Sequence, residues 1–256
     1  MTPPHIHIPY EKIEYYSDFI LKNRLNLEIY FKSSVLDEIE RDSIMKLREG
    51  LDYNPSLSIH APFMDLSPGA IDSKIKKATI ERFNQVLDIA ELLSPKIIVF
   101  HSGYEKWKYA LKVEPWLEKS IETWKPLNEK AKALGIKIAI ENIFEDEPYN
   151  LKLLMEHMDS DNFGICFDTG HFNLFTNKPL IEWINALKPY IIELHLHDNN
   201  GSADQHLPIG DGNFDFKEFF NIFNNDNCIF TIEAHSPESV LKSMKRLEQF
   251  QSPISK

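Results

Sequence analysis

The sequence contains only two cysteines among its 256 residues, Cys166 and Cys228. Each lies within an apolar run that is typical of a buried strand, so we expect two small core residues and no disulfide framework. Long hydrophobic runs are also lacking, and no segment is long enough to span a bilayer. The polar residues 1–5 show no signal-peptide pattern. We therefore expect a cytoplasmic protein with no membrane partner.

Clustered positive charge is scarce as well. The chain has 28 lysines and arginines against 39 aspartates and glutamates, which gives a formal net charge of -11. A protein that grips duplex DNA normally presents grouped basic side chains to the phosphates. The short lysine groups at 74–77 and 106–108 are typical of solvated faces. The charge therefore argues against duplex DNA as a partner and favours a small-molecule substrate.

A glycine-rich phosphate loop is missing after the first apolar run, which argues against a doubly wound open sheet. Eight short apolar runs instead alternate with segments of helical period, a pattern that predicts repeated βα units. The predicted strands are 5–8, 26–30, 56–60, 96–101, 136–141, 163–168, 191–197 and 229–233. The predicted helices begin near residues 10, 35, 72, 113, 150, 179, 215 and 237. The α/β pattern predicts a single (β/α)8 TIM-barrel domain over residues 1–256.

Six consecutive predicted strands, the third to the eighth, each end on a potential metal ligand. One such residue alone is more often a structural residue or a helix cap, but the ends of parallel barrel strands converge on one mouth. Three carboxylates and three imidazoles packed there would repel and desolvate one another unless cations lay between them. The mixture favours zinc, manganese or iron over calcium or magnesium. The six residues are His60, His101, Glu141, Asp168, His195 and Glu233.

Further polar residues lie close to these strand ends. Three additional ligand candidates follow the sixth and seventh strands, namely His171, Asp204 and His206. Residues expected behind the ligands or against the substrate are His197 and Asp198, and those at the rim are His7, Glu28 and Tyr30. Glu193 also points inward, and an inward carboxylate requires a partner. Aromatic residues that could line a pocket or pack in the core are Phe63, Tyr104, Trp107 and Phe172.

Six segments together resemble one known group of barrels. They are SIHAPF (58–63), VFHSG (99–103), IEN (140–142), FDTGH (167–171), HLHDN (195–199) and HLPIGDG (206–212). This set is similar to the xylose isomerase-like TIM-barrel superfamily, which includes the endonuclease IV group, or AP endonuclease family 2. The resemblance covers nearly the whole chain and is clearest from the third strand to the eighth.

The resemblance to endonuclease IV implies up to three zinc ions, with manganese as the alternative metal. His60 and His101 would hold the first ion and share Glu141 with the second. Asp168, His195 and Glu233 would complete the second, and His171, Asp204 and His206 would bind the third. The sugar isomerases and epimerases of the superfamily need one ion, held at the positions of Glu141, Asp168, His195 and Glu233.

Three functions are compatible with these residues. The first is a metal-dependent phosphoester or phosphodiester hydrolase, with Glu141, Glu233 and His171 as the catalytic candidates; one branch that the chain resembles cleaves the nucleotide loop of cobamides. The second is a sugar or sugar-phosphate isomerase or epimerase, in which Glu141 and Glu233 move a proton on opposite faces of an enediolate. The third is a non-catalytic metal-binding protein, which open coordination at a barrel mouth disfavours.

Overall fold

Eight parallel strands close into a barrel in the computed structural model, which describes residues 3–223 and 227–251. Each strand pairs with the next along the chain, and the last pairs with the first. This confirms the predicted (β/α)8 TIM barrel. The strands are β1 (His5–Pro9), β2 (Asn26–Tyr30), β3 (Leu57–His60), β4 (Ile97–His101), β5 (Lys137–Glu141), β6 (Phe163–Asp168), β7 (Ile191–Leu196) and β8 (Ile229–Ile232).

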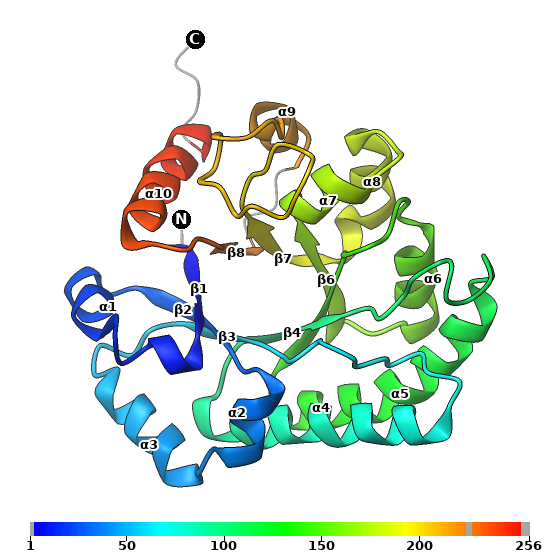
Figure 1. Ribbon diagram of the computed structural model, residues 1–256, viewed down its shortest axis with the longest axis horizontal. Coiled ribbons are helices and arrows are strands. Elements are labelled where there is room, and N and C mark those ends of the chain that lie inside the picture. Colours follow the sequence, from blue (N-terminus) through cyan, green and yellow to red (C-terminus); the bar gives the residue numbers. More distant parts are fainter. Residues whose placement is uncertain (1–2, 224–226, 252–256) are drawn as a thin grey trace.

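Helices surround the strands in a ring (Figure 1). Among the described residues none of them is both long and apolar enough to cross a membrane. The α-helices are α1 (Ser17–Asn23), α2 (Ser33–Glu38), α3 (Arg41–Gly50), α4 (Ser73–Leu93), α5 (Glu114–Ala133), α6 (Tyr149–Met158), α7 (Thr169–Phe175), α8 (Leu180–Leu187), α9 (Phe216–Ile222) and α10 (Pro237–Gln251). Two short 3-10 helices are η1 (Tyr10–Lys12) and η2 (Lys188–Tyr190).

The helices depart from the predicted pattern in three places. The helix predicted from residue 10 is only the 3-10 helix η1 there, and the α-helix α1 begins at Ser17. The helix predicted from residue 35 is divided into α2 and α3, because Ile39 and Glu40 are extended. Helix α7 follows β6 directly, with no loop between them, and it was not predicted as a separate element. The Asp168 side chain caps it by accepting a hydrogen bond from the His171 backbone N–H at 2.6 Å. Its seven residues are too few for helical periodicity to be recognised in a sequence.

The core has two parts that follow from the alternation of side chains along each strand. Outward residues such as Ile98 and Ile138 are fully buried against the helices. Inward residues form a smaller cluster inside the barrel, which contains Ile97, Val99, Ala139 and Cys166. Both cysteines are free, as expected. The small interior side chains lie below the strand ends and leave room for polar groups above them.

The barrel closes over a short seam. Strands β1 and β2 pair over five residue positions, whereas β1 and β8 pair over only two, His5 with Thr231 and Ile6 with Ile232. The seam brings β8 next to β1. Glu233 follows β8 directly and therefore lies at the mouth.

Candidate metal centre

All nine predicted ligands gather at the carboxyl ends of the strands. Asp168 and His195 are fully buried at the bottom of the group. The others line a cavity of about 1220 Å³ that opens at the mouth of the barrel, namely His60, His101, Glu141, His171, Asp204, His206 and Glu233. The strands position these side chains by register, since His101 lies opposite Glu141 and Asp168 opposite His195 in neighbouring strands.

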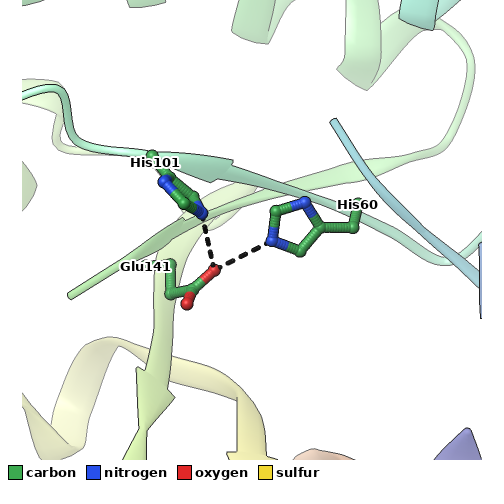
Figure 2. A group of neighbouring side chains, drawn as sticks. All are labelled: His60, His101 and Glu141. Carbon is green, nitrogen blue, oxygen red and sulfur yellow. Dashed lines mark hydrogen bonds and ion pairs between the residues drawn. The ribbon is translucent and has the colours of Figure 1, made fainter. Parts of the chain in front are cut away.

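The first group joins β3, β4 and β5 (Figure 2). The Nε2 atoms of His60 and His101 lie 3.1 and 3.4 Å from Glu141 Oε2. His60 Nδ1 donates to the carbonyl of Ala61 at 2.8 Å, which leaves Nε2, now bonded to Glu141, as the atom that would bind an ion. Phe63 stacks on the His101 ring with centroids 4.2 Å apart and fixes its orientation. These three ligands can therefore bind one cation without rearrangement of the strands.

The second group surrounds His195 Nδ1. This atom is buried and accepts or donates no hydrogen bond among the described residues. Three carboxylate oxygens nevertheless lie 3.3 Å (Glu233), 3.6 Å (Glu141) and 3.7 Å (Asp168) from it. Ligands at zinc distances are separated by about 3.3 Å along the edge of a tetrahedron. The spacing therefore fits four ligands around one ion.

The third group lies nearer the solvent. Asp204 Oδ2 is 3.0 Å from His206 Nε2 and 3.5 Å from His171 Nε2. The other ring nitrogen of His171 lies 2.9 Å from Glu141 Oε1, so His171 connects the third group to the first two. The side chain of Asp204 is 38% exposed, which gives this group the most open position of the three.

His197 lies deeper in the cluster than the sequence predicted. Its Nε2 is 3.1 Å from Asp168 Oδ2, and its ring stacks on His206 at 4.1 Å. It shares two potential ligand groups, one with Asp168 and His171 and one with His206 and Glu233. The alternation of side chains along a strand could have predicted this position, because it places residues 195 and 197 on the same side. Asp198, in contrast, accepts backbone hydrogen bonds from Gly212 and Phe214 and holds the following loop.

Two inward carboxylates have partners below the ligands. Glu28 lies 3.1 and 3.2 Å from His195 Nε2 through its two oxygens. Glu193 accepts hydrogen bonds from Thr231 Oγ1 at 2.6 Å and from Ser58 Oγ at 3.3 Å. Glu28 is thus a contact of a predicted ligand, and the partners that Glu193 required are hydroxyl groups.

The charges of the cluster shift its pKa values strongly. Burial lowers the pKa of His206, but its hydrogen bond to Asp204 and the charge of Glu233 outweigh burial and raise that pKa to about 9. Burial raises the pKa of Glu233, but the charges of His195 and other histidines outweigh it and hold that pKa far below its usual range. In the same way, nearby histidines hold the pKa of Glu141 well below its usual value against the effect of burial. The carboxylates are therefore ionised and ready to bind cations.

The predicted aromatic residues divide between the cavity and other environments. Phe63 and Tyr104 line the cavity, as do His7 and Tyr30 at its rim. Phe172 is buried and packs against Trp183 in the core. Trp107 is exposed and does not line the cavity.

The fold and the site define a (β/α)8 barrel with a cluster of potential metal ligands at the carboxyl ends of its strands. The family is shown by direct comparison: the model of the xylose isomerase-like TIM barrel family matches residues 27–250, and the chain belongs to this family. This confirms the resemblance seen in the sequence motifs.

Individual proteins agree with this assignment. The uncharacterized protein MJ1311 of Methanocaldococcus jannaschii is 31% identical over 216 residues, which cover 81% of this chain and 73% of the relative. The structure of the TTHB071 protein from Thermus thermophilus, soaked with ZnCl2, has a TM-score of 0.82 at 23% identity and covers 98% of this chain and 100% of its own. A D-tagatose 3-epimerase-like protein has a TM-score of 0.78 at 28% identity, with 96% of each chain covered.

Proposed function

We propose that this protein is a metal-dependent phosphoester hydrolase that uses clustered divalent ions, zinc first and manganese as the alternative. The observation that supports this proposal most directly is the third group, His171, Asp204 and His206, which adjoins the first two through Glu141. A sugar isomerase of this superfamily needs only the four ligands of the second group. The five additional donors are sufficient to hold further ions in a multinuclear site.

The ligand set fits zinc. Imidazole nitrogens and carboxylate oxygens are ligands that zinc prefers in mixed sites. The buried His195 Nδ1, which lacks a hydrogen bond among the described residues, faces three carboxylates at ligand–ligand spacing. We assign His60, His101 and Glu141 to one ion, and Glu141, Asp168, His195 and Glu233 to a second. His171, Asp204 and His206 would hold the third.

Divalent ions in such a site supply Lewis acidity toward phosphoryl oxygens and lower the pKa of coordinated water. The protein contributes the positions of the ligand side chains around the ions. Glu141 joins two groups through its two oxygens, with Oε2 beside His60 and His101 and Oε1 beside His171. His206 lines the cavity at the open side of the cluster, where it would hold the third ion together with Asp204 and His171.

The test of this proposal is metal content measured together with turnover. Protein purified without added metal and then loaded with zinc should contain three ions per chain and hydrolyse bis(4-nitrophenyl) phosphate. Asp204→Asn should remove one ion and lower kcat/KM by about a hundredfold, because a charged ligand becomes a neutral amide. Asp211→Asn is the control, since Asp211 pairs with Lys242 and Arg246 away from the cluster. One ion per chain together with no turnover would refute the hydrolase proposal.

A second candidate is a sugar epimerase. It is favoured by the 28% identity, over 96% of each chain, with a D-tagatose 3-epimerase-like protein. Glu141 and Glu233 are both buried at the mouth and both face His195 Nδ1, as a proton-transfer pair around one ion would. Deuterium exchange from solvent into a ketose would support it, and Glu233→Gln should abolish that exchange. A Glu141→Gln variant that keeps its fold and loses either reaction would exclude a purely structural metal site.

A further inference from the structure

The cavity at the mouth of the barrel has a branch that lies outside the ring of strands. Side chains alternate along a strand, so His5 and His7 of β1 point into the barrel, whereas Ile6 and Ile8 point outward to the helices. His7 lines the cavity on the inner side, beside the ligand cluster. The outward residues Ile6 and Ile8 line the same cavity. The cavity therefore continues past β1 into the layer between the barrel and its helices.

The short seam between β1 and β8 accounts for this connection. The pairing of the two strands ends at Ile6 and Ile232, so no pair of the ladder lies nearer to the mouth. Beyond that pair, residues from both chain segments line the cavity, with Ile8 on one side and Ala234 on the other. The branch thus leaves the mouth at the point where the hydrogen-bonded seam has ended.

The branch, which we call the side chamber, has an aliphatic lining. Helices α1 and α10 flank β1 in the ring (Figure 1). Helix α1 has only seven residues, against 21 in α4, and so covers a shorter part of its strand. Six buried residues from β1, α1, the start of β2 and α10 line the chamber, each at most 7% exposed, namely Ile6, Ile8, Ile20, Leu25, Leu27 and Val240. Flexible aliphatic walls of this kind suit an alkyl chain, which gains free energy by leaving water.

Basic groups lie where the side chamber meets the mouth. Lys12, at the end of η1, and His235, after β8, both line the cavity. Lys12 has no ion pair among the described residues, and the neighbouring Glu11 pairs with Lys32 instead. The ring of His235 stacks on that of His206 with centroids 5.0 Å apart, so this entrance adjoins the third ligand group. An anionic head group at the entrance would find a free cation in Lys12.

We propose that the side chamber is a binding site for a free, straight-chain fatty acid of medium length, with its carboxylate at Lys12 and its alkyl chain along the outer face of β1. The outer face from Pro9 to Ile6 is about 10 Å long, which matches an extended chain of about eight carbons. The chamber contains none of the nine predicted metal ligands. The proposal therefore does not depend on the hydrolase function, and no bond is made or broken at this site.

The depth of the chamber is tested by calorimetric titration with straight-chain carboxylates from butyrate to dodecanoate. The affinity should rise about threefold for each added carbon, because each buries one more methylene, and should level off near about eight carbons. Metal-free and zinc-loaded protein should give the same dependence on chain length, since the chamber holds no ligand. An affinity that does not change with chain length, or one that still rises at dodecanoate, would overturn the proposal.

The head group is tested with octanoate and its uncharged methyl ester. Octanoate should bind about fivefold more tightly, and Lys12→Gln should remove this difference, because the ester cannot pair with Lys12. Lys32→Gln is the control, since Lys32 pairs with Glu11 and does not line the cavity. Equal binding of acid and ester by the wild type would refute the assignment of a free fatty acid.

The position of the chain is tested with Val240→Phe, whose ring would fill the chamber. This variant should bind octanoate at least about tenfold more weakly and keep the metal content of the wild type. Val86→Phe, the same change at a fully buried valine of α4 outside the cavity, is the control. Urea denaturation adds a measurement without ligand: Val240→Phe should keep its midpoint, whereas Val86→Phe should lower it because its ring has no room. Undiminished octanoate binding by Val240→Phe, or equal losses of midpoint in the two variants, would overturn the proposal.

Discussion

Glu28 controls how His195 faces the cluster. Both of its oxygens lie within 3.2 Å of His195 Nε2, which therefore donates to Glu28, and Nδ1 is left toward Glu141, Asp168 and Glu233 as the atom that would bind an ion. Both residues are fully buried, so water does not compete for this contact. A carboxylate behind a histidine ligand fixes the tautomer and strengthens the ligand.

Glu28→Gln should weaken zinc binding by about 10- to 100-fold, because the amide no longer supplies the charge that orients and polarises His195. Competition with a zinc chelator measures the affinity without any assay of turnover. Glu145→Gln is the control, since Glu145 is also buried but accepts its hydrogen bonds from Ser102 and the Ile143 backbone N–H. Equal losses of affinity in the two variants would show that Glu28 acts only through general packing.

His5 gives the barrel interior a pH dependence. It is buried on β1 and bonds Ser58 Oγ at 2.8 Å and Ser56 Oγ at 2.9 Å. Burial lowers its pKa from the ordinary value of 6.5 to about 4, against the opposing charge of Glu28. The unfolded chain therefore binds more protons than the folded chain between these two values. Stability is retained above pH 6.5 and lost as pH falls toward 4.

The contribution of His5 can be isolated with a His5→Gln variant. Between pH 7.5 and pH 5 the free energy of unfolding of the metal-free wild type should fall by about 2 kcal/mol more than that of the variant. Urea denaturation at the two pH values gives both numbers. His157→Gln is the control, because His157 is exposed and bonds only the backbone oxygen of Leu153 among the described residues. The prediction fails if wild type and His5→Gln respond to pH alike.

Helix α7 connects the fold to the site at the scale of an element. It begins on the ligand Asp168 without a loop, and Gly170 in its first turn lies against the His197 ring. A Cβ at Gly170 would be 2.0 Å from His197 Cε1, which is far inside van der Waals contact. Only glycine allows the helix and the ring to occupy these positions together.

Gly170→Ala should therefore lower the free energy of unfolding by about 2 kcal/mol or more and weaken zinc binding, because His197 must move away. Gly50→Ala is the control, since nothing lies within 4 Å of the Cβ that it would add. Denaturation and zinc titration of both variants give the comparison. A Gly170→Ala protein with unchanged zinc affinity would show that His197 does not act on the metal site.

The sequence predicted the elements whose signal is local. The strand ends at His60, His101, Glu141 and Asp168 follow directly from apolar runs that end on a polar residue, and all four are observed. Helix α7 escaped prediction because it is too short to show a period and no turn residues precede it. The contact between Glu28 and His195 joins residues 167 positions apart across the barrel, and no local pattern encodes it.

For the molecule as a whole, bound metal should stabilise the fold, because the ligand groups exist only in the closed barrel. Above the dissociation constants, each tenfold rise in free zinc should increase the free energy of unfolding by about 1.4 kcal/mol for each bound ion. Three ions would give a slope of about 4 kcal/mol for each tenfold rise in free zinc. Urea denaturation in zinc buffers measures this slope, with calcium as the control cation. A slope of zero would contradict the metal assignment altogether.

The wide spacing of the ligands along the chain has a consequence for how the protein is made. His60 emerges early from the ribosome, whereas Asp204, His206 and Glu233 emerge last. A nascent chain that stops before β8 lacks Glu233 of the second group and also the strand that closes the seam with β1. Firm capture of the full set of ions thus has to wait until β8 and Glu233 have been synthesised, and a product truncated before them would remain without it.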